Sequence, residues 1–429
     1  MLQAASICEM TSITPVAGAQ YHWTSAFAPG SLKGFAAWLQ GWVTWFGYIS
    51  IEAGMANVTM IFLQSIVQLN HPDFVPGGWK TAVLVILMFA FLAALNIYGF
   101  PFVPYIEMVA GVLHIVLFLI IFILLLVSGT RNSGGFWLST NSSSGWPDGF
   151  VSWNLGLVTS VWAFTGLDGA AHMSEDTRRA SSAVPRAIFW SILVNGLLGF
   201  AMVNALILAM GSLEQVLAGG NPIITILLRT TTSKRATTVL MSMFSIINFS
   251  CNIANVASVS RLTHAWARDK GLPAYFSVID PKRNVPVRAV CLAVFVPCLL
   301  CLLNLGNAPF VAFGALTSLS SISLYTSYAI AIASMLYSRF TGKIVRGEWN
   351  LGRYGACINV FALIFTLYVM VFLPFPSTLP VTAANMNYCG PLMLFVLVVV
   401  VVYWFASARK AWKRLDDSIA ARVIEIDKH

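Results

Sequence analysis

The sequence has very little charge. Only 10% of its 429 residues are Asp, Glu, Lys or Arg, whereas about a quarter are charged in an ordinary soluble domain. Apolar residues make up 58% of the chain. No soluble core needs that proportion, so the composition excludes an ordinary water-soluble protein and indicates helices that face lipid.

The chain also lacks common enzyme motifs. It contains no GxxxxGK[ST] phosphate loop, no HExxH zinc motif and no GxSxG nucleophile elbow. Of seven cysteines, Cys298 and Cys301 have CxxC spacing, but they flank two leucines in an apolar run, without a second pair or a histidine to complete a metal site. We therefore interpret the cysteines as packing residues, and we predict no catalytic residue, no metal and no cofactor.

The net charge of +9 is not gathered in one basic patch. Lys and Arg stand between apolar runs, whereas a nucleic-acid binder clusters them on one folded face. Nucleic acid is therefore not an expected partner. Nor is a cleaved signal peptide indicated, because no basic region with a short apolar core follows Met1.

Ten long apolar runs are present, and the lipid bilayer is the expected partner. A helix of about 20 apolar residues crosses a hydrocarbon layer roughly 30 Å thick. The expected fold class is an all-α polytopic membrane protein, with a membrane domain over residues 1–406 and a tail over 407–429. The approximate limits of the runs are 34–66, 79–98, 104–128, 153–172, 187–210, 236–262, 289–304, 309–337, 354–374 and 388–406.

The basic residues predict the orientation. If the runs cross the membrane in turn, 20 of the 25 Lys and Arg residues fall on the side that carries both termini. The positive-inside tendency then places both termini in the cytoplasm. The sequon at Asn141 falls on the outer side, as a glycosylation site requires. The plasma membrane is the first expectation, and a vacuolar or other internal membrane stays open.

Three acidic residues lie inside the runs: Glu52, Glu107 and Asp168. A charged side chain at the centre of a span costs about 2.5 to 3.5 kcal/mol. Asp168 belongs to the segment 162–169 (WAFTGLDG), where glycines interrupt the apolar pattern. Such a segment predicts a broken helix whose free N–H and C=O groups bind a solute. The alternative is a kinked helix in which Asp168 caps the next turn, and the two glutamates could equally join helices.

Other polar groups inside the runs have two interpretations each. His114 lies near the middle of the third run and is either a proton carrier or a neutral partner of a neighbouring helix. In the sixth run, Ser245, Asn248, Asn252 and Asn255 share one helix face. This face either lines a solute path or joins helices by hydrogen bonds.

Three segments carry a resemblance to a known family. They are residues 9–23 (EMTSITPVAGAQYHW), 166–187 (GLDGAAHMSEDTRRASSAVPRA) and 264–273 (HAWARDKGLP). The chain resembles the amino acid-polyamine-organocation transporters, specifically the fungal GABA and choline permease branch, from Met1 through the last span. The resemblance implies a LeuT-like fold, with two inverted five-helix repeats and two further helices, and secondary transport usually driven by a proton gradient.

The resemblance also implies roles for residues. Residues 164–168 match the unwound stretch of the sixth helix, Trp162 matches an aromatic gate, and the asparagine face matches the eighth helix. The implied substrate-binding residues are Trp162, Phe164, Thr165, Gly166, Leu167, Asn248 and Asn252. The implied coupling or gating residues are Asp168, His114 and Glu52.

One departure from the family pattern is large, because Met1 falls near the end of the family's second helix. The first helix and most of the second are missing, so ten spans and a helix stump are expected. The leading hypothesis is a proton-coupled permease for an amino acid, GABA or choline. The alternative is a non-transporting membrane receptor, or an inactive fragment, that keeps the transporter fold.

Overall fold

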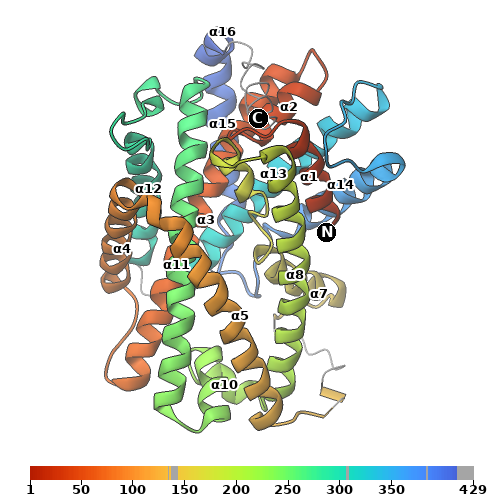
Figure 1. Cartoon of the computed structure of the whole chain (residues 1–429). Helices are drawn as coiled ribbons and strands as arrows, with labels where there is room; N and C mark the ends of the chain where they lie inside the picture. Colours follow the sequence, from red (N-terminus) through yellow and green to blue (C-terminus); the bar gives the residue numbers. More distant parts are fainter. Residues whose placement is uncertain (134, 137–143, 306–308, 383–384, 413–429) are drawn as a thin grey trace.

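The computed structural model describes residues 1–133, 135–136, 144–305, 309–382 and 385–412, and within them the chain is a bundle of helices (Figure 1). These ranges contain two isolated β-bridges and no strand. The predicted sequon at Asn141 lies outside the described residues, as does the tail from residue 413 onward.

The α-helices are α1 (Leu2–Ile13), α2 (Gln20–Phe27), α3 (Lys33–Asn70), α4 (Trp79–Tyr98), α5 (Val103–Ser128), α7 (Gly149–Trp162), α8 (Ala180–Ala209), α9 (Leu213–Ala218), α10 (Pro222–Thr231), α11 (Lys234–Arg268), α12 (Val287–Cys301), α13 (Pro309–Phe340), α14 (Gly355–Phe372), α15 (Cys389–Tyr403) and α16 (Arg409–Ala411). Shorter 3₁₀ helices are η1 (Phe100–Phe102), η2 (Gly169–Asp176), η3 (Ala274–Ser277), η4 (Leu302–Leu305) and η5 (Gly352–Tyr354). A single π-helical segment, η6 (Trp404–Ala408), follows α15.

Nine helices among the described residues are long and apolar enough to cross a membrane. They match nine of the ten predicted runs, so the all-α polytopic fold class is confirmed. The exception is the fourth run, 153–172. It forms only the 14-residue helix α7, and then the chain leaves the α-helical conformation.

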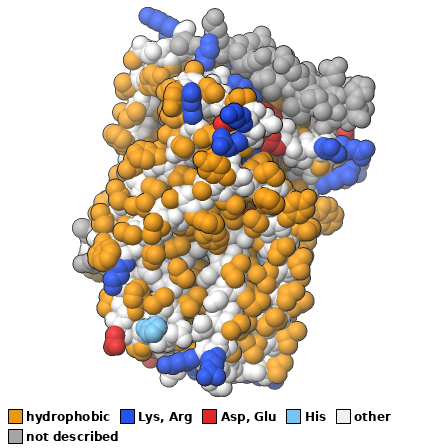
Figure 2. All heavy atoms as spheres, turned by 60° about the vertical axis from the view of Figure 1, so that its left-hand side comes forward, with side chains coloured by type: hydrophobic (Ala, Val, Ile, Leu, Met, Phe, Trp, Pro, Cys, Tyr) orange, Lys and Arg blue, Asp and Glu red, His pale blue; other side chains and the backbone are white. Residues whose placement is uncertain are grey.

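The spans divide into central and peripheral helices. In the most apolar 18-residue stretch of α3 and of α13, 67% is buried inside the protein. In the corresponding stretch of α8, only 11% is buried. The central helices carry small and hydroxyl side chains, which let backbones approach. The peripheral helices α5 and α8 present large apolar side chains outward. Figure 2 shows hydrophobic side chains of all elements on one face covering its middle, with Lys and Arg toward its two ends.

An aromatic cluster closes one end of the bundle, the end that carries α2 and α16 at the top of Figure 1. Trp266 of α11 contacts Trp38 and Trp42 of α3, with ring centroids 5.7 and 6.2 Å apart. This packing needs Gly41, because a Cβ there would stand 2.3 Å from the Trp266 ring. We call this end the α2 end, and the opposite end the α10 end.

A buried ion pair attaches α1 to α13. Arg339 donates from Nη2 to Oε2 of Glu9, and Nε donates to Oδ1 of Asn359 at 3.1 Å. The second oxygen of Glu9 accepts from the backbone N–H of Leu351 at 3.0 Å. The two side chains are 14% and 3% exposed, so neither charge has much water as an alternative partner.

Replacing Arg339 by Met is expected to lower the free energy of unfolding by about 3 to 5 kcal/mol, because it leaves the Glu9 carboxylate buried without its cation. Thermal unfolding of the detergent-solubilised protein measures the effect. The exposed Arg346→Met variant is the matched control. Adding Glu9→Gln to Arg339→Met is expected to recover part of the loss, and an unchanged melting temperature for Arg339→Met would contradict the assignment.

Candidate functional site

The candidate site is the break between α7 and η2. Helix α7 begins at a side-chain cap, where Oδ1 of Asp148 accepts from the N–H of Phe150 at 2.7 Å. Residues 163–168 form turns, and Gly166 has a φ of +81°, which favours glycine. Asp168 precedes η2 but makes no capping hydrogen bond there. The predicted interruption is therefore present, and the alternative of a kinked helix capped by Asp168 is wrong.

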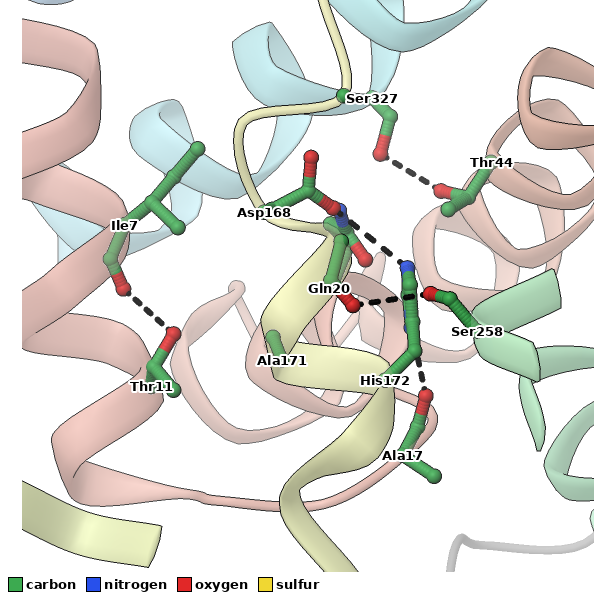
Figure 3. Close-up of polar contacts among 12 residues, drawn as sticks. Ile7, Thr11, Ala17, Gln20, Thr44, Asp168, Ala171, His172, Ser258 and Ser327 are labelled. Carbon is green, nitrogen blue, oxygen red and sulfur yellow. Dashed lines mark hydrogen bonds and ion pairs between the residues drawn. The ribbon is translucent and has the colours of Figure 1, made fainter. Parts of the chain in front are cut away.

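The Asp168 carboxylate is fully buried and has partners from three elements. Figure 3 shows Asp168 beside Gln20 and His172. Gln20 of α2 donates from Nε2 to Oδ2. The hydroxyl of Tyr328, on α13, donates to Oδ1. Nε2 of His172 lies 3.6 Å from Oδ2, one helical turn further along the chain. Asp168 thus connects the broken helix to α2 and to the central helix α13.

His172 is a site residue that the sequence analysis did not single out. Its side chain is fully buried between Asp168 and the backbone carbonyl of Ala17, which lies 2.7 Å from Nδ1. The ring of Tyr48 stands edge-on to it, with centroids 4.7 Å apart. The spacing of four residues from Asp168 was the available signal, because residues four apart in a helical segment lie on the same face.

Side chains from neighbouring helices satisfy backbone groups that the break sets free. The N–H of Gly166 donates to the Tyr328 hydroxyl at 3.1 Å, and the Ser258 hydroxyl donates to the carbonyl of Gly169 at 2.9 Å. The hydroxyls of Thr165 and Ser321 are 3.3 Å apart. Backbone groups inside a membrane need hydrogen-bond partners from the protein itself. These contacts supply such partners, so the chain can leave the α-helical conformation after α7.

A cavity of about 410 Å³ lies between α7, α13, the end of α14 and the segment that follows it. The rings of Trp162 and Phe313 meet edge-to-face in its wall, with centroids 5.3 Å apart. Ser318 and Ser321 add hydroxyl groups. Since Ser321 also contacts Thr165, the cavity reaches the broken segment. An aromatic wall with a few hydroxyls suits a small solute that carries an ammonium group.

Only some of the predicted substrate-binding residues lie at this cavity. Trp162 lines it, and Thr165 contacts it through Ser321. Phe164 and Leu167 are not among its lining residues. A Cβ on Gly196 of α8 would stand 3.6 Å from the Phe164 ring, so Phe164 lies toward α8.

The asparagines of α11 lie elsewhere. Asn252 is fully buried and donates from Nδ2 to Oγ1 of Thr59 on α3, at 3.0 Å. Asn248 donates to the carbonyl of Phe244 in its own helix, at 3.0 Å. Neither residue lines the cavity. The Asn252 contact is the one expected of a side chain that joins two helices.

Among the described residues, the other predicted coupling residues make no hydrogen bond or ion pair with the break. Glu52 is fully buried in α3, and neither carboxyl oxygen has a hydrogen-bond partner among the described residues. His114 lines a second cavity of about 370 Å³ between α5, α8, α10 and α11. The two cavities share no lining residue. Coupling through Glu52 or His114 stays a prediction.

Ion pairs close the α2 end of the break. Arg268 binds both carboxylate oxygens of Glu175 at 2.8 and 3.0 Å, and the N–H of Ala17 donates to the same carboxylate at 3.0 Å. Asp269 accepts from the Tyr21 hydroxyl and contacts Nε2 of His22, both at 2.8 Å. These contacts hold η2, α11 and the start of α2 together.

Asp269 has a lowered pKa. Burial alone would raise the pKa of this carboxyl, but the hydrogen bond and charge of His22, with the charge of Arg268, bring it below the ordinary 3.8. A carboxyl with a lower pKa in the folded state contributes stability above its ordinary pKa, and loses that contribution as the pH falls through the folded value. The ionised Asp269 therefore stabilises the α2 end at neutral pH, and this contribution is lost in acid.

The described residues offer no metal site, because they contain no group of three or more His, Cys, Asp or Glu side chains that could hold an ion. The chemistry at the break is thus that of hydrogen-bond donors and acceptors, one buried carboxylate, one buried imidazole and an aromatic wall.

The nine candidate spans among the described residues define a class, the multi-pass membrane proteins. A family model described as amino acid permease matches residues 1–401, and the chain belongs to this family. The expected membership of the amino acid-polyamine-organocation superfamily is confirmed. The chain is therefore a multi-pass membrane protein of a transporter family, as predicted.

Several curated proteins are similar over most of the chain. A choline transporter of Saccharomyces cerevisiae is 29% identical over 420 residues, which are 96% of this chain and 74% of that protein. An amino-acid permease of Arabidopsis thaliana is 26% identical over 430 residues, 95% of this chain and 82% of that protein. A putative amino acid/polyamine transporter of Macrophomina phaseolina is 28% identical over 395 residues, 90% of this chain and 86% of that protein.

Among solved structures, the substrate-bound outward-open state of a Na⁺-coupled sialic acid symporter is similar to this chain. The sequence identity is 11% and the TM-score is 0.45. The likeness covers 87% of this chain and 88% of the symporter.

Replacing Gly166 by Ala is expected to destabilise the break. The positive φ costs an L-residue about 1 to 2 kcal/mol, and the added Cβ would stand 3.0 Å from Cδ1 of Ile51. Thermal unfolding in detergent measures the loss. Gly156→Ala, in the regular part of α7, is the matched control, because a Cβ there meets nothing within 4 Å. Equal melting temperatures for the two variants would contradict the strained geometry.

Proposed function

We propose that this protein is a secondary active transporter that moves a small amine-bearing solute, such as an amino acid, GABA or choline, by alternating access and with proton coupling. The observation that carries the proposal is the 410 Å³ cavity that reaches a broken helix, with a fully buried carboxylate at the break. The names of the similar proteins, a choline transporter and amino-acid permeases, support an amine as the solute.

The cavity supports recognition of a small cation or zwitterion. Its volume lies within the roughly 300 to 1,000 Å³ that is usual for small-molecule sites. The faces of Trp162 and Phe313 attract a positive ammonium group, at about 0.5 to 2 kcal/mol per contact. The hydroxyls of Thr317, Ser318 and Ser321 supply donors and acceptors for the rest of the solute.

The two ends of the break differ in a way that suits alternating access. At the α10 end, the cavity is bordered by Phe375, Asn385 and Met386, from the segment after α14. At the α2 end, the pairs of Glu175 with Arg268 and of Asp269 with His22 close the structure. In the proposed cycle the solute enters from the α10 end, and the pairs at the α2 end separate to release it.

The proposed orientation places the α2 end and both termini in the cytoplasm of a plasma-membrane protein. The support is the distribution of Lys and Arg, 20 of 25 of which fall on that side. In this orientation solute uptake runs from the α10 end to the α2 end, into the cell.

The alternative is a membrane receptor that keeps the transporter fold and binds the solute without moving it. The same cavity would serve either function, so the measurement that separates them is transport rather than binding. Saturable solute binding by the purified protein, with no uptake into cells or vesicles, would favour the receptor.

Replacing Asp168 by Asn, or Thr165 by Ala, is expected to lower solute uptake at least about tenfold. A hydrogen bond to a charged group is worth about 1.5 to 3 kcal/mol, and about 1.4 kcal/mol is a factor of ten. The measurement is uptake of labelled choline, GABA and amino acids by a host that lacks its own permeases. Asp73→Asn, at an exposed position between α3 and α4, is the matched control. Uptake at the wild-type rate in both site variants would show that the solute binds elsewhere.

The proposed orientation has its own test. An epitope tag at the C-terminus is expected to bind antibody only after the cells are permeabilised. Asn141→Gln is expected to remove a glycan and increase the mobility of the protein in gels, since Asn141 falls on the outer side in this orientation. Antibody binding to intact cells would reverse the orientation.

A further inference from the structure

The hydrogen bonds of His172 determine where its ring carries a proton. Nδ1 lies 2.7 Å from the carbonyl oxygen of Ala17. A carbonyl oxygen only accepts, so Nδ1 must carry the hydrogen. In a neutral imidazole the other nitrogen is then a bare acceptor. That nitrogen, Nε2, has no hydrogen-bond partner among the described residues and lies 3.6 Å from Oδ2 of Asp168.

Two acceptors facing each other in a dry interior repel unless a proton lies between them. The side chains of Asp168 and His172 are both 0% exposed, so bulk water does not screen the two atoms. Gln20 and Tyr328 donate to the two carboxylate oxygens, as expected for the ionised form of Asp168. The repulsion between Nε2 and Oδ2 is therefore removed when Nε2 also carries a proton, because the positive imidazolium then balances the negative carboxylate.

Among the described residues, no other positive charge close to Asp168 takes the place of the proton on Nε2 of His172. The ionisable side chains that face the pair are Tyr48 of α3 and Tyr328 of α13. In the described part of the chain, no lysine or arginine lies within 4 Å of Asp168. The nearest element α2 contributes the uncharged Gln20, and α11 contributes Ser258.

The arginines around η2 have other partners. Arg261 of α11 pairs with Asp176 at 3.1 Å, and Arg268 pairs with Glu175, both at the far end of η2 from Asp168. His264 of α11 is not bonded to either member of the pair. The charged residue of α8, Arg186, is exposed. The proton on His172 is thus the local counter-charge of Asp168.

We propose that Asp168 and His172 together bind the proton that drives transport, and that its release loosens the α2 end. This inference rests on the proposed function and deepens it, because it names the residues that hold the coupling ion. The sequence predicted Asp168 as a coupling or gating residue, and the inference adds His172 as the group that accepts the proton.

The proton step balances without any further reactant. The Nε2–H bond breaks, its electron pair stays on the nitrogen, and the proton passes to water at the α2 end. The pair then carries one uncompensated negative charge, which is costly in a dry interior. Admission of water from the α2 end relieves that cost. This opening moves the segment of Ala17, which binds His172 through its carbonyl and Glu175 through its N–H.

His114 provides a comparison for the same substitution. It lies in the cavity between α5 and α8, whose lining contains no carboxylate. Protonation of His114 would therefore create a charge without a partner in that cavity. His71, exposed after the end of α3, is the surface control.

The test measures two activities of the full chain in proteoliposomes, for wild type and for His172→Gln, His114→Gln and His71→Gln. Counterflow exchange of labelled solute at equal pH requires binding and reorientation, but no net proton movement. Accumulation driven by an imposed pH gradient requires proton coupling as well. Labelled choline, GABA and a mixture of amino acids are the probes.

His172→Gln is expected to retain exchange within about twofold and to lose at least about tenfold in gradient-driven accumulation, with an uptake rate that no longer depends on pH. His71→Gln is expected to behave as wild type in both assays, and His114→Gln tests the competing prediction of a proton site in the second cavity.

Four results would overturn the inference. Undiminished accumulation in His172→Gln would show that the proton binds elsewhere, and equal loss of exchange and accumulation would indicate a merely structural role. Wild-type transport that ignores the pH gradient would remove the inference while leaving the proposed transporter intact. Absence of both activities in the wild type would remove the proposed function, and the inference with it.

Discussion

The structure depends on one constraint, that every backbone N–H and C=O inside a membrane needs a partner from the protein itself. In the nine candidate spans among the described residues, the helices meet most of this requirement with their own backbone hydrogen bonds. The break after α7 meets it differently, because Tyr328 and Ser258 bind backbone groups that a continuous helix would have paired internally. Helices α11 and α13 are therefore needed for the break to exist, and not only for packing around it.

The same constraint separates the helices that surround the site from those that face lipid. The central helices α3 and α13 carry side chains such as Tyr48 and Tyr328, which reach the break. Helices α5 and α8 carry mostly large apolar side chains and bury little of their surface. The polar site is thus lined by the central helices, while the peripheral helices present apolar side chains outward.

The sequence predicted the helices and the position of the break well, because both follow from local patterns: apolar runs and the glycines around Asp168. It did not predict the partners of Asp168. Gln20 lies 148 positions away along the chain and Tyr328 lies 160 away, so no periodicity connects them. The sequence pattern predicted that Asn252 lies on a polar face of its helix. Whether that face lines a solute path or contacts Thr59 depends on how the helices pack, which the pattern does not give.

Ala17 illustrates how a site can depend on a residue without depending on its side chain. Its carbonyl binds His172 and its N–H binds Glu175, so both anchors are backbone atoms. A change of side chain that fits this buried position leaves both anchors in place. Only proline, which has no N–H, removes one of them. The position is therefore expected to tolerate small apolar replacements, although it holds together two ionisable groups of the site.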